Sequence, residues 1–365
     1  MAYLEMNVEK LKKNYEFLDR MFKSNNIQWA VVSKVLCGNK LYLTELMNLG
    51  IKQICDSRLS NLKNIKLIND KIETIYIKPP AKREITNIVK FANISVNTEI
   101  STIKLLSKAA KKLNKVHKIF IMIEMGELRE GVLRDDFIKF YGKVFELENI
   151  EIVGIGTNFS CLYGVLPNAD KLIQLSLYEQ LIEAKFNKNI PFVSGGSSVV
   201  IPLILSNILP KGINHFRVGE TLFLGTDLYH DKLIDGMEYD IFKLYAEIIE
   251  LTEKPSIPSG ELGTNVEGKD FEFNTNEIGK ESYRAIINLG LLDVDEKHFW
   301  SSDKHIEFVG ASSDMIVIDL KNNPNNYKVG DLLEFKMDYM GILRLMNSKY
   351  IEKRIKTTAN KQLHS

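Results

Sequence analysis

The sequence lacks three features: a paired set of cysteines, a long apolar run and an excess of charge of one sign. Its 365 residues include only Cys37, Cys55 and Cys161, whose odd number and wide spacing indicate neither a disulfide framework nor a metal site. With 48 basic and 47 acidic residues, the net charge of +1 gives no electrostatic reason to expect nucleic acid or an anionic membrane as a partner. No signal peptide or membrane-spanning run is found, so we expect a reduced, cytoplasmic protein.

The order of apolar residues along the chain is informative. The composition, 45% hydrophobic and 26% charged, is typical of a globular protein with a substantial core. Apolar residues at three- and four-residue spacing predict a helix over residues 7–23. Eight short β-rich runs then alternate with helical stretches, at residues 30–34, 53–57, 74–78, 94–98, 118–126, 151–158, 192–196 and 215–220. Several runs are apolar at consecutive positions, as is typical of parallel strands buried on both faces.

This alternation predicts an α/β fold with a (β/α)8 TIM-type barrel over residues 1–228. A doubly wound open sheet is the alternative, but no G-x-G-x-x-G turn follows the first strand. After about Tyr229 the β-rich runs are separated by turns, with no helical runs between them. We therefore predict a second, mainly antiparallel β domain over residues 229–365, to which parts of the N-terminal helix can contribute.

Polar or glycine residues stand where each of the eight apolar runs finishes. In chain order they are Lys34, Asp56-Ser57, Lys78, Asn97-Thr98, Glu124, Thr157-Asn158, Ser194-Gly195-Gly196 and Arg217. In a barrel these ends converge on the face where active sites lie. The alternative, that a polar residue merely caps the following helix, is strongest for Asp56-Ser57 and Asn97-Thr98.

Two of these ends are suited to bind an anion. The segment "SGGSS" (194–198) follows the seventh run, and "RVGE" (217–220) ends the eighth, where barrels of this type usually bind phosphate. Glycines there leave backbone N–H groups free to point at phosphate oxygens. Lys34 at the end of the first run could react with a phosphorylated aldehyde cofactor as a Schiff base. A simple salt-bridge partner is the alternative role for Lys34.

An ordered set of motifs spans nearly the whole chain. It comprises "VVSKVLCGN", "EMGELREGV", "GTNFSCLYGVLPN", "VSGGSSVVIPL", "INHFRVGETLFLG", "FVGASSDMIVIDL" and "DYMGILRLMNSKY". As a set these motifs resemble the alanine/ornithine racemases among the fold-type III pyridoxal-phosphate enzymes, with the ornithine racemase branch closest. The resemblance implies a pyridoxal 5'-phosphate cofactor and a homodimer with composite active sites, in which the β domain of one subunit caps the site of the other.

The resemblance also implies roles for individual residues. Lys34 would carry the cofactor as a Schiff base and act as one of two acid–base groups. Arg217 would donate to the pyridine nitrogen, and Arg129 would steady the substrate carboxylate. Asn158 stands beside the cofactor, where alanine racemases have a histidine. The phosphate would be held by Gly196, Ser197, Gly219, Glu220 and Tyr339.

The chain departs from the alanine racemases at their second base, a tyrosine in a turn of the β domain. In the matching segment, "NLGLLDVD", Leu291 stands at that position. Candidates for the second proton-transfer group are Asp293, Ser313 and Asp314 in the β domain and Cys161 after the sixth run. For each of them a turn cap or a packed thiol is the alternative role.

The combined interpretation is a racemase that interconverts the L and D forms of a basic amino acid, with ornithine as the first expectation. Asp56, Glu124 and Glu127 are candidates to bind a distal ammonium group. An alanine or broad-specificity racemase is one alternative, and a non-catalytic pyridoxal-phosphate carrier is another. A decarboxylase of the same fold type is disfavoured, because its glutamate-proline-glycine-arginine motif is absent where "VSGGSS" stands.

Overall fold

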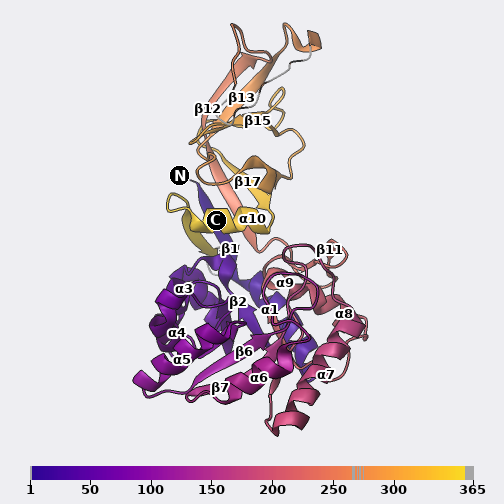
Figure 1. The fold of residues 1–365 in the computed structure, drawn as a ribbon. Helices are drawn as coiled ribbons and strands as arrows, with labels where there is room; N and C mark the ends of the chain where they lie inside the picture. The colour runs from indigo at the N-terminus through magenta and orange to yellow at the C-terminus, as the bar shows by residue number, and fades with distance from the viewer. Residues whose placement is uncertain (1, 265–267, 269, 271–272, 274, 358–365) are drawn as a thin grey trace. The chain divides into compact units, whose positions relative to one another are not determined.

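The structure is a computed structural model that describes residues 2–264, 268, 270, 273 and 275–357. It divides into two compact units, which we name the barrel unit (Glu9–Tyr239) and the sheet unit (Met1–Val8 with Asp240–Ser365) (Figure 1). The boundary therefore lies after Tyr239, whereas the sequence places it after residue 228. The N-terminal strand belongs to the sheet unit, because it pairs with two strands near the C-terminus.

The barrel unit is a closed barrel of eight parallel strands, which confirms the predicted fold class. Its strands are β2 (Gln28–Val32), β3 (Gln53–Asp56), β4 (Glu73–Tyr76), β5 (Ile94–Asn97), β6 (His117–Met122), β7 (Ile150–Gly156), β8 (Phe192–Ser194) and β9 (His215–Val218). Each lies within or overlaps one of the eight predicted runs. The barrel closes where β9 pairs with β2, and this pairing sets Ala30 beside Arg217 and Val31 beside Val218.

Helices follow the strands and cover the barrel, as Figure 1 shows for α3 to α8. The helices are α1 (Val8–Ser24), α2 (Lys40–Asn48), α3 (Leu59–Ile68), α4 (Ile85–Phe91), α5 (Ile100–Lys112), α6 (Phe137–Phe145), α7 (Ala169–Phe186), α8 (Ile201–Leu205) and α9 (Glu220–Leu224). Local sequence decides several of their ends. In α7, Asn168 caps the first turn by accepting from the Lys171 amide at 2.9 Å, and Asn187 ends the helix in a left-handed conformation.

The barrel interior is packed with apolar side chains. Its core cluster consists of Ala30, Val32, Cys55, Ile75, Ile94, Val96, Phe120, Met122 and Val153. Phe120 fills much of this space because Gly154 on the neighbouring strand has no side chain. A Cβ at Gly154 would lie 2.1 Å from the Phe120 ring, far inside van der Waals contact. Polar groups that act on a ligand are therefore confined to the strand ends.

The sheet unit is an eight-stranded, mainly antiparallel sheet, which confirms the predicted β-rich second part. Its strands are β1 (Tyr3–Asn7), β12 (Phe242–Pro255), β13 (Glu281–Ile287), β14 (Phe299–Ser301), β15 (Glu307–Ala311), β16 (Ile316–Asp319), β17 (Leu332–Met337) and β18 (Glu352–Lys356). The sequence analysis missed β1, β18 and the helix α10 (Tyr339–Asn347). The missed strand β18 reads "EKRIK", whose charges hide its β propensity.

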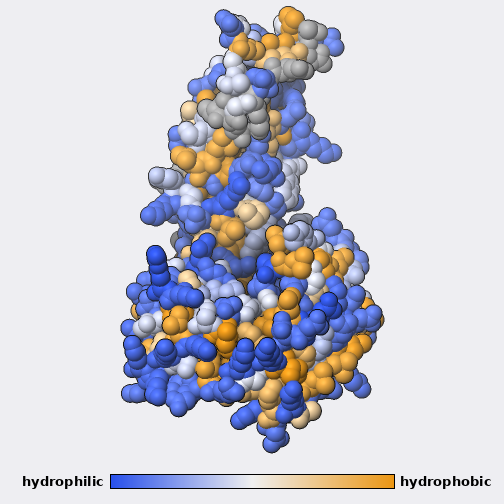
Figure 2. All heavy atoms as spheres, viewed as in Figure 1, coloured by the Kyte–Doolittle hydropathy of each residue, from blue (hydrophilic) through white to orange (hydrophobic). Residues whose placement is uncertain are grey.

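The surface is mixed in character. Figure 2 shows hydrophilic side chains over most of the visible face, with apolar ones interspersed among them. Within the described residues, no helix has both the length and the apolar character needed to span a bilayer.

Candidate active site

Lys34 lies just beyond the end of β2, as the first residue of a short 3-10 turn (η1, Lys34–Leu36). The preceding residue is fixed, because the Ser33 amide donates to the Cys55 carbonyl at 2.9 Å and its hydroxyl donates to Asp56 at 2.9 Å. The Lys34 side chain is exposed and has no hydrogen bond or ion pair among the described residues. A salt-bridge role for Lys34 therefore finds no partner in this part of the chain.

The polar residues at the ends of β3 and β5, Asp56 and Asn97, form different kinds of hydrogen bond. Asp56 accepts from the Arg58 amide at 2.9 Å, and Arg58 is the N-cap of α3, so Asp56 precedes this helix and does not cap it. Asn97 instead folds back, and its amide group donates to both the carbonyl and the hydroxyl of Ser95 at 2.9 Å. The Oδ1 atom of Asn97 is buried and has no hydrogen-bond partner among the described residues.

The turns after β8 and β9 contain backbone amides that lack acceptors among the described residues. Gly196 has a φ of +132°, a conformation that favours glycine, and Ser197 is extended before the 3-10 turn η3 (Ser198–Val200). The N–H groups of Gly196, Ser197 and Ser198 have no acceptor among the described residues. A Cβ at Gly219 would lie 3.1 Å from Val32, so glycine lets this turn approach the end of β2. These features fit a phosphate group at the end of the barrel that carries Lys34.

Arg217 on β9 is a buried cation held by neutral groups. Its guanidinium donates to the Thr157 carbonyl and to the Asn158 Oδ1, both at 2.7 Å, and to the Ser194 hydroxyl. Burial lowers the pKa of Arg217 from its ordinary value. A guanidinium has five N–H donors, and three are used here, so two remain for a ligand.

A hydrogen-bonded chain runs from Arg217 into the barrel. Because Arg217 can only donate, the Ser194 hydroxyl accepts from it and donates to Nδ1 of His215, at 2.8 Å. The other ring nitrogen, Nε2, then carries the proton and donates to Gln53 at 3.3 Å. Burial, followed by the nearby Arg217 charge, lowers the pKa of His215 to about 3, so the ring is neutral.

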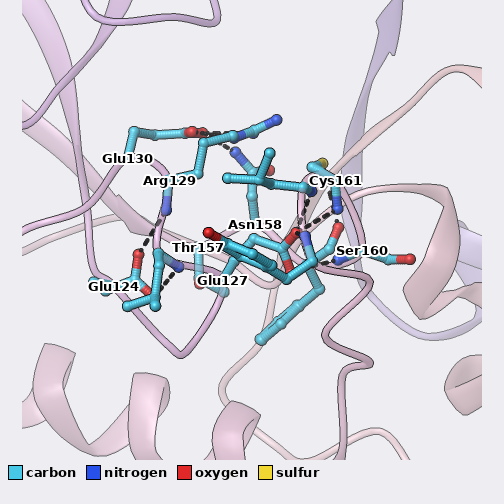
Figure 3. Close-up of polar contacts among 12 residues, drawn as sticks. Glu124, Glu127, Arg129, Glu130, Thr157, Asn158, Ser160 and Cys161 are labelled. Atoms are coloured by element: carbon cyan, nitrogen blue, oxygen red, sulfur yellow. Dashed lines mark hydrogen bonds and ion pairs between the residues drawn. The ribbon is translucent and has the colours of Figure 1, made fainter.

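A second chain links Arg217 to Arg129 at the surface of the site, and Figure 3 shows its part from Asn158 through Glu130 to Arg129. Asn158 accepts from Arg217 and donates to Glu130, and Glu130 binds Arg129 through both Nε and Nη2. Since Glu130 occupies this edge of the guanidinium, a carboxylate ligand must approach through Nη1. The exposed thiol of Cys161 lies beside Arg129.

Two buried glutamates hold the loops that carry these residues. Glu127 accepts five backbone N–H groups from the segment 160–165, among them those of Cys161 at 2.8 Å and Tyr163 at 2.9 Å. Burial raises the pKa of Glu127, but these hydrogen bonds outweigh it and leave the pKa below its usual range. Glu124 likewise accepts from the amides of Gly126, Leu128 and Arg129. Both carboxylates therefore anchor loops, and the five amides at Glu127 leave no acceptor site there for a distal ammonium group.

The buried histidines make folding stability depend on pH. The unfolded chain protonates a histidine near pH 6.5, whereas His215 and His117 have folded pKa values of about 3 and about 4. Stability should be complete above pH 6.5 and fall by about 1.4 kcal/mol per pH unit for each ring as the pH decreases to those values. Urea unfolding at several pH values measures this slope.

Imidazole nitrogen NMR provides the matching local test. We expect His215 to stay neutral near pH 5, with the proton on Nε2, as the chain from Arg217 requires. A doubly protonated His215 ring in the folded protein near pH 5 would contradict the hydrogen-bond assignment.

The candidates for a second base in the sheet unit lie close together. A Cβ at Gly290 would lie 2.3 Å from the Ser313 carbonyl, and the Leu291 amide donates to the Ser312 carbonyl at 3.0 Å. Asp293, beside the first turn, accepts from the Ser348 hydroxyl at 2.7 Å. In the second turn, the Ser313 hydroxyl donates to Asp314 at 2.8 Å. Tyr339 is the first residue of α10, whose cap is Asp338.

Comparison with known proteins places this geometry in a family. Residues 6–227 match the family model described as alanine racemase, N-terminal domain. The chain belongs to the alanine racemase family. Within it, the chain is 38% identical to ornithine racemase of Acetoanaerobium sticklandii, over 96% of this chain and 99% of that protein. It is 32% identical to lysine racemase of Thermotoga maritima, over 96% and 97% of the two chains.

Solved structures of this family share the fold. Alanine racemase of Clostridium difficile 630 superposes with a TM-score of 0.75 at 15% identity, covering 98% of this chain and 96% of that one. Alanine racemase from Bartonella henselae, with covalently bound pyridoxal phosphate, gives 0.73 at 16% identity, covering 97% and 99%. The predicted resemblance and the prediction of a racemase are confirmed.

The sequence analysis missed two parts of this alanine racemase-family site. Glu130 stands in the motif "EMGELREGV", but its hydrogen bonds with Arg129 and with Asn158 were not predicted. Its place directly after Arg129 is the one signal that could have indicated an ion pair. The chain from Ser194 to His215 has no local signal, because its members lie 21 residues apart on different strands.

Proposed function

We propose that this chain is a pyridoxal 5'-phosphate-dependent racemase of a basic amino acid, with ornithine as the substrate. The observation that carries the proposal is a set of groups at one end of the barrel. They are Lys34 and the amides of Gly196 and Ser197, which have no partner in the described part of the chain, and the buried Arg217. The higher identity, 38% to ornithine racemase, supports ornithine as the substrate. The similarity to lysine racemase, at 32% identity, supports a substrate with a basic side chain.

The residues fit the cofactor at three points. The free amides of Gly196 and Ser197 would hold the phosphate together with Gly219 and Glu220, and Tyr339 would add a hydroxyl. The Gly219 amide donates to the Ser198 hydroxyl at 3.3 Å in this structure and would exchange that acceptor for the phosphate. The two unused N–H donors of Arg217 would face the ring nitrogen, beside Asn158. Lys34 would bind the aldehyde carbon covalently. When bound, the cofactor supplies a conjugated ring that takes up the electron pair left behind as the Cα proton departs.

Arg217 limits how far that electron uptake goes. A guanidinium does not surrender its proton, so Arg217 would leave the ring nitrogen of a bound cofactor largely unprotonated. The cofactor would then supply a weaker electron sink, which would suppress side reactions and suits a racemase. The hydrogen bonds from Arg217 to Thr157, Asn158 and Ser194 fix its guanidinium before any ligand binds.

Racemisation needs a proton donor and a proton acceptor on opposite faces of Cα. Lys34 would move the proton on one face, and Arg129 would orient the substrate carboxylate through Nη1, since Glu130 holds the other edge. The group on the opposite face is one of Asp293, Ser313, Asp314 and Cys161. Of these, Cys161 lies in the barrel unit beside Arg129.

The protein would act as a homodimer with composite active sites, in which the sheet unit of one subunit contributes to the site of the other. Size-exclusion chromatography with light scattering should give twice the monomer mass of 41.8 kDa. A stable monomer with full activity would contradict this assembly.

The experiment that tests the function is chiral chromatography of reactions with purified protein, pyridoxal phosphate and a panel of L-amino acids. We expect D-ornithine, with D-lysine formed more slowly and D-alanine at background. Faster turnover of alanine would replace ornithine in the proposal. Cofactor binding without any D-isomer would favour the non-catalytic carrier, and carbon dioxide release from a basic amino acid would favour a decarboxylase.

A further inference from the structure

The barrel unit has a groove between the N-terminus of α3 and the helix α4 that the proposed reaction does not use. It encloses about 560 Å³, within the range of small-molecule sites. Its lining includes Arg58, Lys63, Tyr76, Lys78, Glu84 and Lys90. The segment after β3 and the segment after β4 both contribute, so the groove lies toward the ends of these strands, on the outer side of the barrel wall.

The charge of this groove is strongly positive. Four basic side chains line it, those of Arg58, Lys63, Lys78 and Lys90, against the single carboxylate of Glu84. None of the four forms an ion pair or side-chain hydrogen bond with the described residues. Neighbouring like charges repel each other, and a bound anion would relieve that repulsion. The charge therefore indicates an anionic ligand.

Tyr76 gives independent evidence for a ligand. This residue is 1% exposed and lines the groove, yet its hydroxyl has no hydrogen-bond partner among the described residues. Because the rest of the Tyr76 side chain is buried and the hydroxyl opens into the groove, a ligand atom there would supply an acceptor for it. Burial, with the nearby Glu84, raises the pKa of Tyr76 to about 12, so the phenol is a neutral donor.

The first turn of α3 adds backbone donors on the same side. No side chain caps this ten-residue helix at Arg58, and the amides of Leu59 and Ser60 have no acceptor among the described residues. Asp56 lies next to this turn and accepts from the Arg58 amide at 2.9 Å and from the Asn61 side-chain amide at 3.0 Å, but not from the amides of Leu59 and Ser60. Free amides at a helix N-terminus favour a phosphate or a carboxylate.

We propose that this groove binds a small organic phosphate, with its phosphoryl group between the first turn of α3 and the Tyr76 hydroxyl. A phosphoryl group has three terminal oxygens, which match donors that surround the groove on several sides. The volume exceeds that of a phosphate alone, which leaves room for an organic part against Phe91. A diamino acid is excluded as the ligand, because the four cations would repel its distal ammonium group.

The groove is connected to the proposed active site through one residue. Asp56 accepts from the Arg58 amide at the groove and from the Ser33 hydroxyl, which directly precedes Lys34, at 2.9 Å each. Two hydrogen bonds, from Arg58 to Asp56 and from Ser33 to Asp56, therefore connect a ligand site at the first turn of α3 with the residue before Lys34.

Isothermal titration calorimetry of the cofactor-loaded protein tests the proposal, because loading fills the separate phosphate site at Gly196 and Ser197. Glycerol 3-phosphate and inorganic phosphate are the two probes. We expect one equivalent of glycerol phosphate to bind, more tightly than inorganic phosphate. Tyr76→Phe should weaken binding about five- to tenfold, the effect of losing one neutral donor, without loss of thermal stability, since it removes an unpaired hydroxyl.

Two lysine variants complete the design. Lys63→Gln should weaken binding, whereas Lys82→Gln, a matched change at an exposed lysine outside the groove lining, should not. No binding by the wild type, or equal affinity of wild type and Tyr76→Phe, would overturn the proposal. Equal affinity for both probes would overturn the organic part of it. The readout is binding, so these outcomes do not depend on whether racemisation is observed.

Discussion

Racemisation should be abolished when Lys34 is replaced by alanine, with turnover falling at least about 10⁴-fold. In the proposed mechanism this residue both binds the cofactor and moves one of the two protons, so its loss removes two functions together. The folded state should be unaffected, because the Lys34 side chain is exposed and makes no hydrogen bond or ion pair with the described residues. Chiral chromatography measures the rate, and thermal unfolding measures the stability.

Lys40→Ala is the matched control for Lys34→Ala. Lys40 is an exposed lysine at the start of α2, six positions further along the chain, and its removal changes the net charge by the same amount. Borohydride reduction followed by mass spectrometry should add the mass of the cofactor to the wild type and to Lys40→Ala, but not to Lys34→Ala. D-ornithine formation by Lys34→Ala at the wild-type rate would refute the mechanism.

Replacing Arg217 by lysine should reduce both stability and activity. Lysine keeps the charge but loses the planar fork, so the Thr157 carbonyl, Asn158 and Ser194 cannot all keep their donor. Because these groups are buried or partly buried, we expect the free energy of unfolding to fall by about 3 kcal/mol. We expect kcat/KM to fall about 10²-fold, because the cofactor ring would lose a positioned donor. Urea unfolding and chiral kinetics measure the two effects.

Arg134→Lys provides the comparison for Arg217→Lys. Arg134 is exposed and makes one long contact, at 3.5 Å, with Gln174, so the same change there should leave stability within about 0.5 kcal/mol and leave the rate unchanged. Wild-type stability and rate in Arg217→Lys would show that the hydrogen bonds from Arg217 do not support the site.

The barrel could be predicted from the sequence because its signal is local. Parallel strands buried on both faces are short, consecutive apolar runs, and each run ends where a polar residue leaves the core. That pattern located the strand ends that carry Lys34 and Arg217, and with the turn at Gly196 it indicated a phosphate site. The family motifs then suggested which chemistry these residues perform, and the comparisons confirm the family and the racemase class.

The sequence could not show which polar side chains bind one another. Glu127 accepts amides from residues 33 to 38 positions further along the chain, and Asn158 donates to Glu130 across 28 positions. In the sequence Glu124 and Glu127 were equally plausible as ligands for an ammonium group. Their hydrogen bonds to the loops show that both carboxylates are already used.

The sequence by itself therefore determined the order of strands and helices, the polar residues at the strand ends and the family. Periodicity and strand length are properties of a few consecutive residues, so they can be read without a fold. Only the tertiary structure decided that β1 belongs with the C-terminal strands and that Arg217 is held by Thr157 and Asn158. It also decided that the Tyr76 hydroxyl has no partner among the described residues. Such facts depend on strand register and burial, which bring together residues that no local pattern connects.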